Sequence, residues 1–479
     1  MVLASRVARV LIIAGLGAGL AAGVGVGGGC SVKNPDFCCS TLDSCRAVGV
    51  DAVVTCGDPA APFCDDDGAY GAPRACIADP TTPECSTADD CTSATLPRCD
   101  LDDDGGTCAG CAGEDDCTRF AATPHCEPTG GACVACVTSA QCTAAATPVC
   151  DADHACRACA SDDECAAGVC AQAGTCPAAS EIVYVDPAAP AGNVACTQAA
   201  PCPTIAAGLA AVTAARRYVK LAPGMYSEAV VIDGKTVELA GTGATITVPV
   251  GNQVFDVRNA ATVTIGGLRI HQAVGRGMRC ADSTVTLRGM LIDSNLGRAL
   301  ETSSCNVTVD RVRMLSNTAG GMYLMSGRAT VRNSFIARNG NVNFGGGGVV
   351  AVDPIELVME FDTIADNTVP TSSSMAAGFA CSGALAATVT NNIIVGDAAN
   401  QIDSNNCGPT YTLSTESVAG AGNVVGRATF RGATSGDYHL AAGSMGIDAA
   451  DPAATVMVDI DGEARPAGGR SDMGADEVH

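Results

Sequence analysis

Apolar and polar residues alternate in short segments that return at regular intervals between residues 263 and 394. The segments, from TVTIGGLRI to ATVTNNIIV, superimpose at steps of 22, 22, 22, 28 and 30 residues. Three apolar columns result: Val263, Val285, Val307, Ala329, Leu357 and Ala387; Ile265, Leu287, Val309, Val331, Met359 and Val389; and Ile270, Ile292, Met314, Ile336, Ile364 and Ile394. Strand-like alternation at this repeat length predicts that each repeat is one coil of a parallel β-helix.

Polar residues form columns as well. Asn295, Asn317, Asn339 and Asn367 recur at steps of 22, 22 and 28 residues. Strands of successive coils lie about 4.8 Å apart, so residues one repeat apart are neighbours. Asparagine tolerates a left-handed backbone and can hydrogen-bond within its own column. We therefore predict a structural asparagine stack at a tight corner of each coil.

Other polar positions lie outside the predicted core. An outward column alternates in charge, and its members are Arg288, Asp310, Arg332 and Glu360. Alternating charges are typical of a polar sheet face whose register is fixed. Two insertions, residues 339–349 and 367–378, lengthen the repeat and are rich in Gly, Asn and Ser. Loops on a rigid scaffold often carry function, so these insertions are candidate walls of a site.

The segment before the repeats predicts a cap. Thr204 can cap a short amphipathic helix that runs to about Ala215, and Pro223-Gly224 breaks the chain before the first full coils. Such a helix would cover the open end of the solenoid and hide its apolar side chains and unpaired strand edges. We expect about ten coils between this cap and a second cap at the C-terminus.

Cysteines dominate the first third of the chain. The total of 29 cysteines indicates an oxidising compartment, where thiols become cross-links. From residue 85 they form four blocks of four: Cys85, Cys91, Cys99, Cys108; Cys111, Cys117, Cys126, Cys133; Cys136, Cys142, Cys150, Cys156; Cys159, Cys165, Cys170, Cys176. Units of about 25 residues are too short for apolar cores, so we predict two disulfides per unit and leave their pairing open. Residues 38–76 are expected to be a degenerate start of the same array.

Zinc is the alternative for these cysteines. Cys108-x2-Cys111 and Cys133-x2-Cys136 resemble the knuckles of a zinc ribbon. We favour disulfides, because an exported chain loses thiolates to oxidation and because the pairs recur at unit junctions.

An acidic turn offers a weak calcium candidate. Asp100, Asp102 and Asp104, followed by Gly105, match the opening of an EF-hand loop. The twelfth position, however, is Cys111 instead of a bidentate glutamate. A solvated acidic turn is therefore the preferred interpretation, with weak Ca²⁺ binding as the alternative.

Three more disulfides are predicted after the cysteine blocks: Cys196–Cys202, Cys280–Cys305 and Cys381–Cys407. The first is local and would pin the loop before the cap. In each of the other two, the second cysteine lies three positions beyond the stacking partner of the first. We predict two coil-to-coil disulfides, each with a corner that brings the Cα atoms to within about 7 Å.

The N-terminal segment has the layout of a secretory signal. Arg6 and Arg9 precede an apolar run over residues 10–26, and Cys30 follows. The usual lipoprotein signal has a Leu-like residue three before the cysteine, where this chain has Gly27. Cysteine parity favours lipidation, because 29 minus Cys30 leaves an even 28. We predict a lipid on Cys30, with cleavage by an ordinary signal peptidase and secretion as the alternative.

These features predict three parts: a signal peptide (residues 1–29), a cysteine-rich disulfide repeat region (residues 30–180) and the β-helix with its C-terminal cap (residues 181–479). The formal net charge of −24 opposes binding to nucleic acid. Lipid attachment predicts a cell-envelope protein on the outer membrane surface. The remaining partners that we expect are an extracellular glycan or a surface protein.

Both ends of residues 181–479 carry a resemblance. The opening, EIVYVDP with YVKLAPGMYSE, resembles that of the pectate-lyase-like right-handed β-helix superfamily. The ending is similar to that of bacterial β-helix proteins of the choice-of-anchor Q type, at Ile447-Asp448, Asp461-Gly462, Arg465-Pro466, Asp472, Gly474 and Glu477. The cysteine blocks resemble bacterial cysteine-rich surface repeats, which look like spacers. The resemblance implies a right-handed fold and a surface location, and it implies no reaction.

The resemblance raises a catalytic alternative. Lyases of this superfamily use an arginine or lysine as a base beside acidic calcium ligands, which the column that contains Arg288 and Asp310 could imitate. The hydrolase pattern of the superfamily (an NTD run, a DD pair, a GHG and an RIK) is absent from residues 181–479. The chain has no tryptophan to stack on sugar rings. His271 stands alone in the sequence, and a lone histidine is more often a surface residue than a base.

Acidic residues also gather near the C-terminus: Asp448, Asp459, Asp461, Asp472 and Glu477. Arg465 and Arg470 lie beside them, so we expect a salt-bridged cap, with a calcium site as the alternative. We assign no catalytic residue. The sequence favours a non-catalytic surface module for adhesion or for glycan or protein binding. The alternative is a divergent polysaccharide lyase or glycoside hydrolase in a groove along the coils, with the two insertions as walls.

Overall fold

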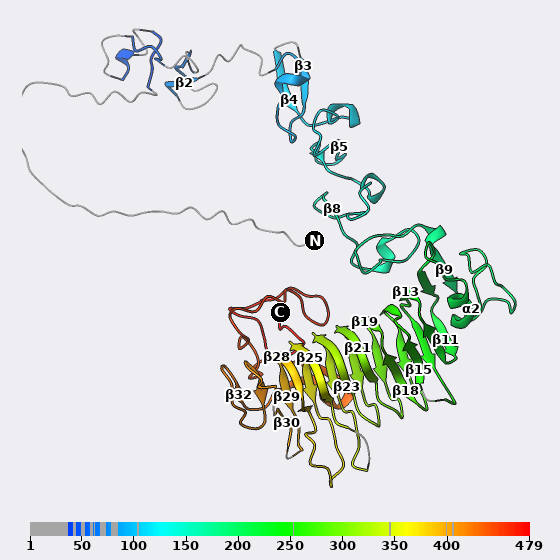
Figure 1. Ribbon diagram of the computed structural model, residues 1–479. Helices are drawn as coiled ribbons and strands as arrows, with labels where there is room; N and C mark the ends of the chain where they lie inside the picture. The colour runs from blue at the N-terminus through cyan, green and yellow to red at the C-terminus, as the bar shows by residue number, and fades with distance from the viewer. Residues whose placement is uncertain are drawn as a thin grey trace, which may run out of the picture. The chain divides into compact units, whose positions relative to one another are not determined.

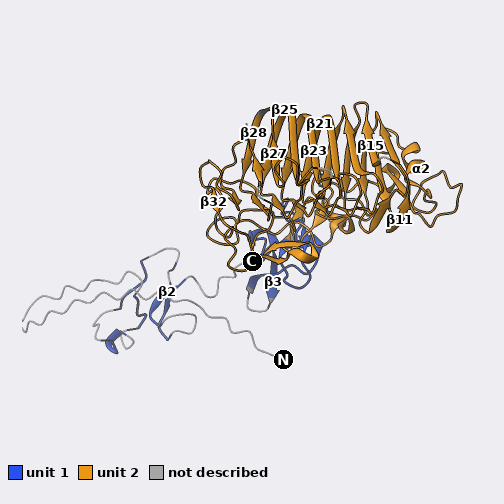
Figure 2. Cartoon of the chain, turned by 90° about the horizontal axis from the view of Figure 1, so that it is seen from below, with its two compact units in different colours: residues 1–133 blue, residues 134–479 orange. Residues whose placement is uncertain are grey.

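The computed structural model describes residues 37–41, 45–48, 53–57, 61, 63–67, 73–77, 85–102, 105–251, 253–343, 346–398, 400–404 and 407–479. The chain divides into two compact units, Met1–Cys133 and Val134–His479 (Figure 2). Cys30 and the signal segment lie outside the described residues, so lipidation stays a prediction. No helix in the described ranges is long and apolar enough to cross a bilayer.

Short strands and turns make up the first unit. Its elements are β1 (Phe63–Asp65), β2 (Ala75–Ile77), η1 (Ala88–Asp90), β3 (Arg98–Asp102), β4 (Gly105–Ala109), η2 (Glu114–Asp116), β5 (His125–Cys126) and β6 (Cys133–Val134), which ends just past the boundary. The third and fourth cysteines of a block lie opposite each other in a hairpin. In the first block, for example, Cys99 on β3 is the register partner of Cys108 on β4. Each bonds instead to a cysteine earlier in its block.

The cysteine pairing left open by the sequence is the same in all four blocks. The first cysteine bonds the third and the second bonds the fourth: Cys85–Cys99, Cys91–Cys108, Cys111–Cys126, Cys117–Cys133, Cys136–Cys150, Cys142–Cys156, Cys159–Cys170 and Cys165–Cys176. The degenerate start follows the same plan with Cys38–Cys64 and Cys56–Cys76, and adds Cys39–Cys45. Two disulfides per unit are therefore confirmed.

The second unit opens with the last two cysteine blocks, which contain η3 (Ser139–Gln141), β7 (Val149–Cys150), β8 (Cys156–Arg157), η4 (Asp162–Glu164) and, after them, η5 (Ala179–Glu181). The fourth block packs against the β-helix, because Val169 and Ala171 are buried against Ile182, Tyr184 and Tyr218. Lys220 Nζ also donates to the carbonyl of Gly168 at 2.7 Å. This block therefore forms part of the β-helix surface.

Parallel strands stack into three faces along the second unit (Figure 1). Face 1 contains β9 (Ile182–Val185), β10 (Tyr218–Leu221), β13 (Thr236–Ala240), β16 (Thr262–Gly266), β19 (Thr284–Arg288), the second halves of β21 (Leu300–Asp310), β23 (Met322–Arg332) and β25 (Val349–Glu360), and β28 (Ala384–Thr390). Face 2 contains β12 (Val230–Asp233), β15 (Gln253–Arg258), β18 (Arg276–Ala281), the first halves of the three long strands, β27 (Phe379–Cys381) and β30 (Ile402–Asp403).

Face 3 contains β11 (Gly224–Ser227), β14 (Ala244–Thr247), β17 (Arg269–His271), β20 (Leu291–Asp293), β22 (Arg313–Leu315), β24 (Phe335–Ala337), β26 (Thr363–Ala365), β29 (Ile393–Val395), β31 (Leu413–Ser414) and β32 (Val424–Val425). The predicted parallel β-helix is confirmed. Among the described residues, face 3 has ten strands, face 1 nine and face 2 eight, so about eight coils have all three sides, against the ten expected. The difference arises because the ends of the domain form a cap and a covering segment instead of further coils.

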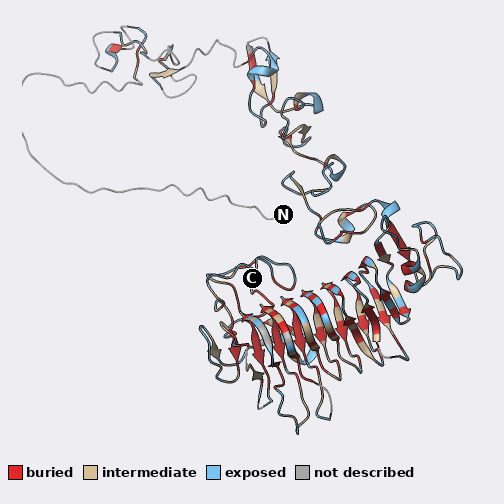
Figure 3. Ribbon diagram, in the orientation of Figure 1, coloured by how far each residue is buried: buried red, intermediate tan, exposed pale blue. Residues whose placement is uncertain are grey.

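The three apolar columns stack in the predicted register. Ile270, Ile292, Met314, Ile336, Ile364 and Ile394 are neighbours in turn on face 3, and each is 0% exposed. Buried residues run as a continuous line through the coils (Figure 3). Burial of each such side chain stabilises the fold by roughly 1.5–3 kcal/mol, so this interior holds the coils together.

The asparagine stack is also confirmed. Asn317 Nδ2 donates to Asn339 Oδ1 at 2.9 Å, and Asn295 Nδ2 donates to Asn317 Oδ1 at 2.8 Å. The preceding residue in each coil has a left-handed backbone, with a φ of 59° at Ser294 and 58° at Ser316. The corner turns between face 3 and face 2, and the buried amides satisfy backbone groups that the turn leaves unpaired.

A helix covers the first coil as predicted, but it is shorter. Helix α2 (Ile205–Ala210) starts at Thr204, whose Oγ1 accepts the N–H of Ala207 at 3.1 Å. It ends before β-branched Val212, where the chain enters a tight turn instead of running to Ala215. A Cβ on Gly208 would lie 2.5 Å from Val185 Cγ2, so a glycine is needed for the helix to pack this closely on β9.

The C-terminal segment covers the outer side of face 3. It includes β33 (Phe430–Gly432), η6 (Ala433–Ser435) and β34 (Asp437–Leu440). Its buried residues pack on side chains of β24, β26 and β29: Tyr438, Leu440, Ala450, Ile460, Met473 and Ala475 against Phe335, Ala337, Ala365, Ile393 and Val395. The C-terminal segment therefore covers one side of the coils, in addition to forming the predicted cap at their end.

All three disulfides predicted after the cysteine blocks are present: Cys196–Cys202, Cys280–Cys305 and Cys381–Cys407, with Cα–Cα distances of 4.5, 6.3 and 6.2 Å. Cys280 stacks on Thr302, three residues before Cys305. The predicted corner lies at Ser304, which has a φ of 53°.

Candidate functional site

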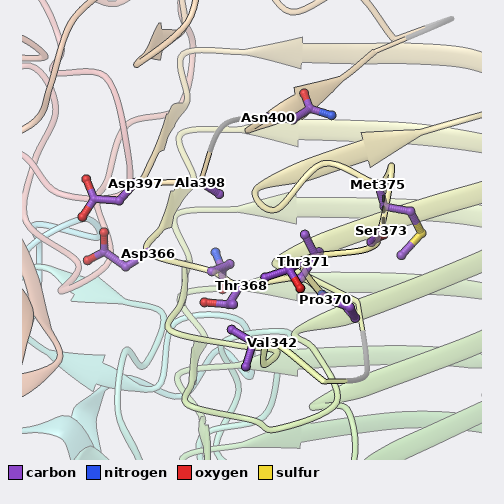
Figure 4. A pocket seen from close by; sticks show the side chains of 12 residues that line it. Val342, Asp366, Thr368, Pro370, Thr371, Ser373, Met375, Asp397, Ala398 and Asn400 are labelled. Carbon is purple, nitrogen blue, oxygen red and sulfur yellow. Dashed lines mark hydrogen bonds between the residues drawn. The ribbon is translucent and has the colours of Figure 1, made fainter.

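The two insertions border a cleft at the corner between face 3 and face 2 (Figure 4). Its volume is about 630 Å³, within the usual range of roughly 300–1,000 Å³ for small-molecule sites. Val342 of the first insertion and most of residues 368–375 of the second, Ser372 and Ser374 excepted, contribute to the lining, together with Asn400. The sequence named these loops as candidate walls, and the structure places both beside one cleft.

Uncharged groups make up most of the cleft lining. Hydroxyl and amide groups come from Asn367, Thr368, Thr371, Ser373 and Asn400, and apolar groups come from Val342, Val369, Pro370 and Met375. Such hydroxyls and amides both donate and accept hydrogen bonds. The lining therefore suits a neutral ligand with many hydroxyl groups and some apolar surface.

Rigid structure supports the cleft from behind. Asn367 is the last residue of the asparagine stack, and its Nδ2 donates to the carbonyl of Ile336 at 2.7 Å. At the other end of the second insertion, Ala376 is buried against Val350 and Ala380 on face 2. Because both ends of the loop are fixed, a ligand would meet groups that are already positioned.

Two carboxylates line the cleft, and each has a partner. Asp366 Oδ2 accepts from the Tyr438 hydroxyl at 2.9 Å. Asp397 Oδ1 pairs with Arg427 Nη1 at 2.8 Å. Burial and the charge of Asp366 raise the pKa of Tyr438, so the phenol remains a donor. Each carboxylate thus has one oxygen engaged and one oxygen that faces no partner in these two interactions, and the Asp397–Arg427 pair lies at the exposed rim of the cleft.

A second recess lies on face 1, with a volume of about 400 Å³. Its floor includes Thr286, Thr308 and Thr330, which stack one above the other on successive coils. Gln172 of the fourth cysteine block and residues 455–458 of the C-terminal segment form its walls. A stacked row of hydroxyls is thus presented between two segments that are distant in sequence.

The predicted charged column borders this recess, and its members stack in the predicted order. Only Arg332 and Glu360 pair directly within the column, at 2.8 Å. Arg288 pairs instead with Glu238 at 3.0 Å and donates to the carbonyl of Cys170 at 2.9 Å. Arg288, which the sequence pattern assigned to the charged column, therefore binds Glu238 and the fourth cysteine block instead of Asp310.

His271 does not stand alone, contrary to the prediction. Its Nδ1 lies 2.8 Å from Asp293 Oδ2, because the two residues are register neighbours on face 3. Arg269 binds the same carboxylate through Nε at 2.6 Å and Nη2 at 2.7 Å. Burial alone would raise the pKa of Asp293, but Arg269 and His271 outweigh it and hold that pKa below its usual value. The coil spacing was the signal that could have found this pair.

The acidic residues near the C-terminus form a salt-bridged cap, as expected. Arg465 and Glu477 are both fully buried and pair at 2.9 Å. Asp472 and Asp459 accept backbone N–H groups, including those of Val478 and Glu477. Their carboxylate oxygens thus bond within the cap.

A histidine cluster in this segment was not predicted. His439 Nδ1 lies 2.5 Å from Asp437 Oδ1, and its Nε2 lies 2.7 Å from Asp461 Oδ2. Arg313 Nη2 reaches the other oxygen of Asp461 at 2.6 Å. Arg313 and Asp461 are 148 residues apart, so no local pattern could have joined them.

The metal candidates of the cysteine region are the aspartates of the acidic turn and the cysteines of the zinc alternative. Asp100 lies on β3 and pairs with Arg98 at 3.1 Å. Asp102 is described by its backbone alone, and Asp104 lies outside the described residues. Cys111 bonds Cys126, and the knuckle cysteines are likewise in disulfides, so the zinc alternative is wrong for them. Weak Ca²⁺ binding at the turn stays a prediction.

Comparison with known proteins gives a likeness of fold. No protein-family model and no curated protein matches the chain. A solved structure described as pectate lyase Pel9A is 16% identical, with a TM-score of 0.42, and the match covers 62% of this chain and 96% of that one. A rhamnogalacturonan lyase is 12% identical, with a TM-score of 0.22, over 49% and 72%. The parallel β-helix is confirmed by the strand pairing of this chain, and no activity follows from these likenesses.

Proposed function

We propose that this protein is an exported β-helix of the cell surface that binds a glycan in the cleft between its two inserted loops and leaves the glycan intact. The disulfide-linked cysteine blocks serve as a spacer, and a lipid on Cys30 holds the protein on the outer membrane. Secretion without a lipid would leave the binding role unchanged.

One observation carries this proposal. The cleft is lined by neutral hydroxyl and amide groups, while its two carboxylates, Asp366 and Asp397, are bonded to Tyr438 and Arg427. Neutral donors and acceptors suit the hydroxyls of a sugar, and Pro370 and Met375 can contact its apolar face. Engaged carboxylates favour binding over acid or base chemistry.

A cleft-filling variant tests the proposal on a glycan array. Thr371→Trp places a bulky ring in the cleft, whereas neighbouring Ser372 is exposed and lies outside the lining, so Ser372→Trp is the matched control. We expect the wild type and the control to retain the same glycans, and Thr371→Trp to bind at least about tenfold more weakly. Equal retention by both variants would overturn the cleft as the site.

The recess on face 1 supports a second candidate, a divergent lyase or hydrolase. Asp310 and Arg332 both border it, which places an acid and a cation beside the hydroxyl row. Incubation with polyuronides and neutral glycans, followed for unsaturated or reducing ends, tests this candidate. Product formation that Asp310→Asn abolishes would favour it over simple binding.

A further inference from the structure

A third pocket lies on face 3 and shares no lining residue with the cleft or the recess. Its volume is about 360 Å³. Leu291 and Leu315 give it an apolar side, and η6 and Gly436 of the C-terminal segment close one edge. The pocket is therefore large enough for roughly one sugar unit.

Two anchored arginines line this pocket. Arg269 uses Nε and Nη2 to grip Asp293, which leaves its Nη1 available. Arg338 donates Nη1 to the carbonyl of Thr434 at 3.0 Å, which leaves Nε and Nη2 available. Because each guanidinium is held at one side, its remaining donors are pre-positioned and lose little freedom on binding an anion.

The charge balance of the pocket favours a single negative charge. Asp293 is the carboxylate in the lining, and it already accepts hydrogen bonds from Arg269, His271 Nδ1 and Ser294 Oγ. Two arginines against one carboxylate leave a net charge of about +1 at the pocket. This local excess is notable in a chain whose formal net charge is −24.

The donor set matches a tetrahedral oxyanion. A planar carboxylate is satisfied by one bidentate arginine, whereas a sulfate has three free oxygens for donors from several directions. Here two guanidiniums are joined by the hydroxyl of Ser316, whereas the hydroxyl protons of Ser294 and Ser435, which also line the pocket, already go to Asp293 Oδ2 and to the carbonyl of Gly432. A phosphate ester carries about −1.5 to −2 charges at neutral pH. The net charge of about +1 at the pocket would leave part of that negative charge unpaired, so a singly charged sulfate ester fits better.

We propose that this pocket binds the sulfate ester of a sulfated glycan, with the sugar ring over Leu291 and Leu315. The site is separate from the loop cleft, so the protein would hold a glycan at two places. Binding involves no bond cleavage. The attraction is electrostatic, so it should weaken as salt screens the arginines.

Calorimetric titration of the full chain tests the proposal with four matched sugars. Glucose 6-sulfate should bind saturably, and its affinity should fall as the salt concentration rises. Glucose 6-phosphate, glucuronate and glucose should each bind at least about tenfold more weakly. No saturable binding of glucose 6-sulfate, or equal binding of any of the other three, would overturn the proposal.

Three variants locate the site. Arg338→Gln removes one guanidinium, and Ser435→Glu adds a negative charge at an exposed turn position without touching either arginine. Each should weaken glucose 6-sulfate binding about tenfold or more. Arg279→Gln is the control, because Arg279 is a partly exposed surface arginine that pairs with Asp256 on face 2, away from the pocket. Unchanged binding in the first two variants, or an equal loss in the control, would overturn the assignment.

One further variant separates this site from the proposed function. Thr371→Trp fills the loop cleft and should leave glucose 6-sulfate binding unchanged. Loss of binding in that variant would place the sulfate in the cleft instead, and would contradict a separate site on face 3.

Discussion

Asp362 lies in a buried corner column in which the next coil has Asn392. The N–H of Ser334 donates to its Oδ1 at 3.0 Å, and its own N–H donates to Asn392 Oδ1 at 2.8 Å. Asn392 donates Nδ2 to the carbonyl of Met359, whereas Asp362 Oδ2 is buried with no hydrogen-bond partner among the described residues. Burial raises the pKa of Asp362 well above its usual value, which favours the protonated acid in the folded chain.

We predict that Asp362→Asn stabilises the β-helix at neutral pH. Above the unfolded pKa of about 3.9, unfolding of the wild type releases a proton, so its free energy of unfolding falls as pH rises toward the folded pKa. Asparagine removes this dependence and supplies a donor for the Val331 carbonyl, which is the register neighbour of Met359. Urea titration at pH 7 should show a gain of about 1–3 kcal/mol.

The pH dependence provides the control for this prediction. Between about pH 4 and pH 7 the stability of the wild type should fall more steeply than that of Asp362→Asn. Asn392→Asp should introduce a second buried acid and steepen the fall. Equal slopes in all three proteins would show that Asp362 is ionised in the folded state.

Asn317 tests the asparagine stack. Its Nδ2 donates to Ile292 O and Asn339 Oδ1, and its Oδ1 accepts from Asn295, all in the buried interior. Asn317→Ala leaves the Ile292 carbonyl, Asn339 Oδ1 and Asn295 Nδ2 without this hydrogen-bond partner. The free energy of unfolding should therefore fall by about 2–4 kcal/mol. Asn306→Ala, at an exposed strand position, should change it by less than about 0.5 kcal/mol. Similar losses in both variants would contradict a structural stack.

At the scale of elements, the hairpin of β33 and β34 is held by charge as well as by apolar packing. Burial opposes a charged His439, but Asp437, Asp476 and Asp461 outweigh it and raise the pKa of the ring. Burial also raises the pKa of Asp476 to about 6. Arg313 and Arg431 are the cations that act on these acids. The attachment of the hairpin therefore depends on pH.

We predict that the hairpin loosens as the solution becomes alkaline. A raised histidine pKa contributes stability that is present below about pH 6.5, the unfolded value, and is lost as pH rises through the folded pKa. Amide hydrogen exchange in residues 430–440, corrected for the intrinsic effect of pH, should increase between about pH 6.5 and pH 9. His439→Gln should abolish this increase. A wild-type hairpin equally protected at both pH values would contradict an attachment that depends on the charge of His439.

At the scale of the whole molecule, the two kinds of architecture depend on different forces. The cysteine blocks are small and rely on two cross-links each, whereas the coils share a continuous apolar interior. A mild reductant should therefore unfold the blocks, since each lost disulfide costs about 2–5 kcal/mol in a small domain. Far-UV circular dichroism and protease cleavage should show intact β-helix strands with cleaved blocks. Simultaneous loss of both would contradict this division.

The sequence could predict whatever repeats at coil spacing. The apolar columns, the asparagine stack and the pairs Cys280–Cys305 and Cys381–Cys407 all follow from a step near 22 residues, because stacking turns sequence distance into contact. Even His271 and Asp293, which we failed to join, are one step apart. The two insertions were visible as lengthened repeats, although the pairing of Asp366 and Asp397 was not.

Contacts between the coils and the flanking segments could not be predicted. Gln172 reaches Thr264, Arg313 meets Asp461, and Tyr438 bonds Asp366 across 92, 148 and 72 residues. No periodicity links these partners, because the last cysteine block and the C-terminal segment return to the coils only after folding. These two segments line the recess on face 1 and the pocket on face 3, so neither site could be predicted from the sequence.

Recovery of a retained glycan tests the central claim most directly. A glycan selected on the array is incubated with the full chain, released, and its length measured by mass spectrometry. The account predicts that the glycan is bound by the wild type, released at its original length, and not retained by Thr371→Trp. A shortened glycan, or one with an unsaturated end, would show that the protein is an enzyme and would contradict the account.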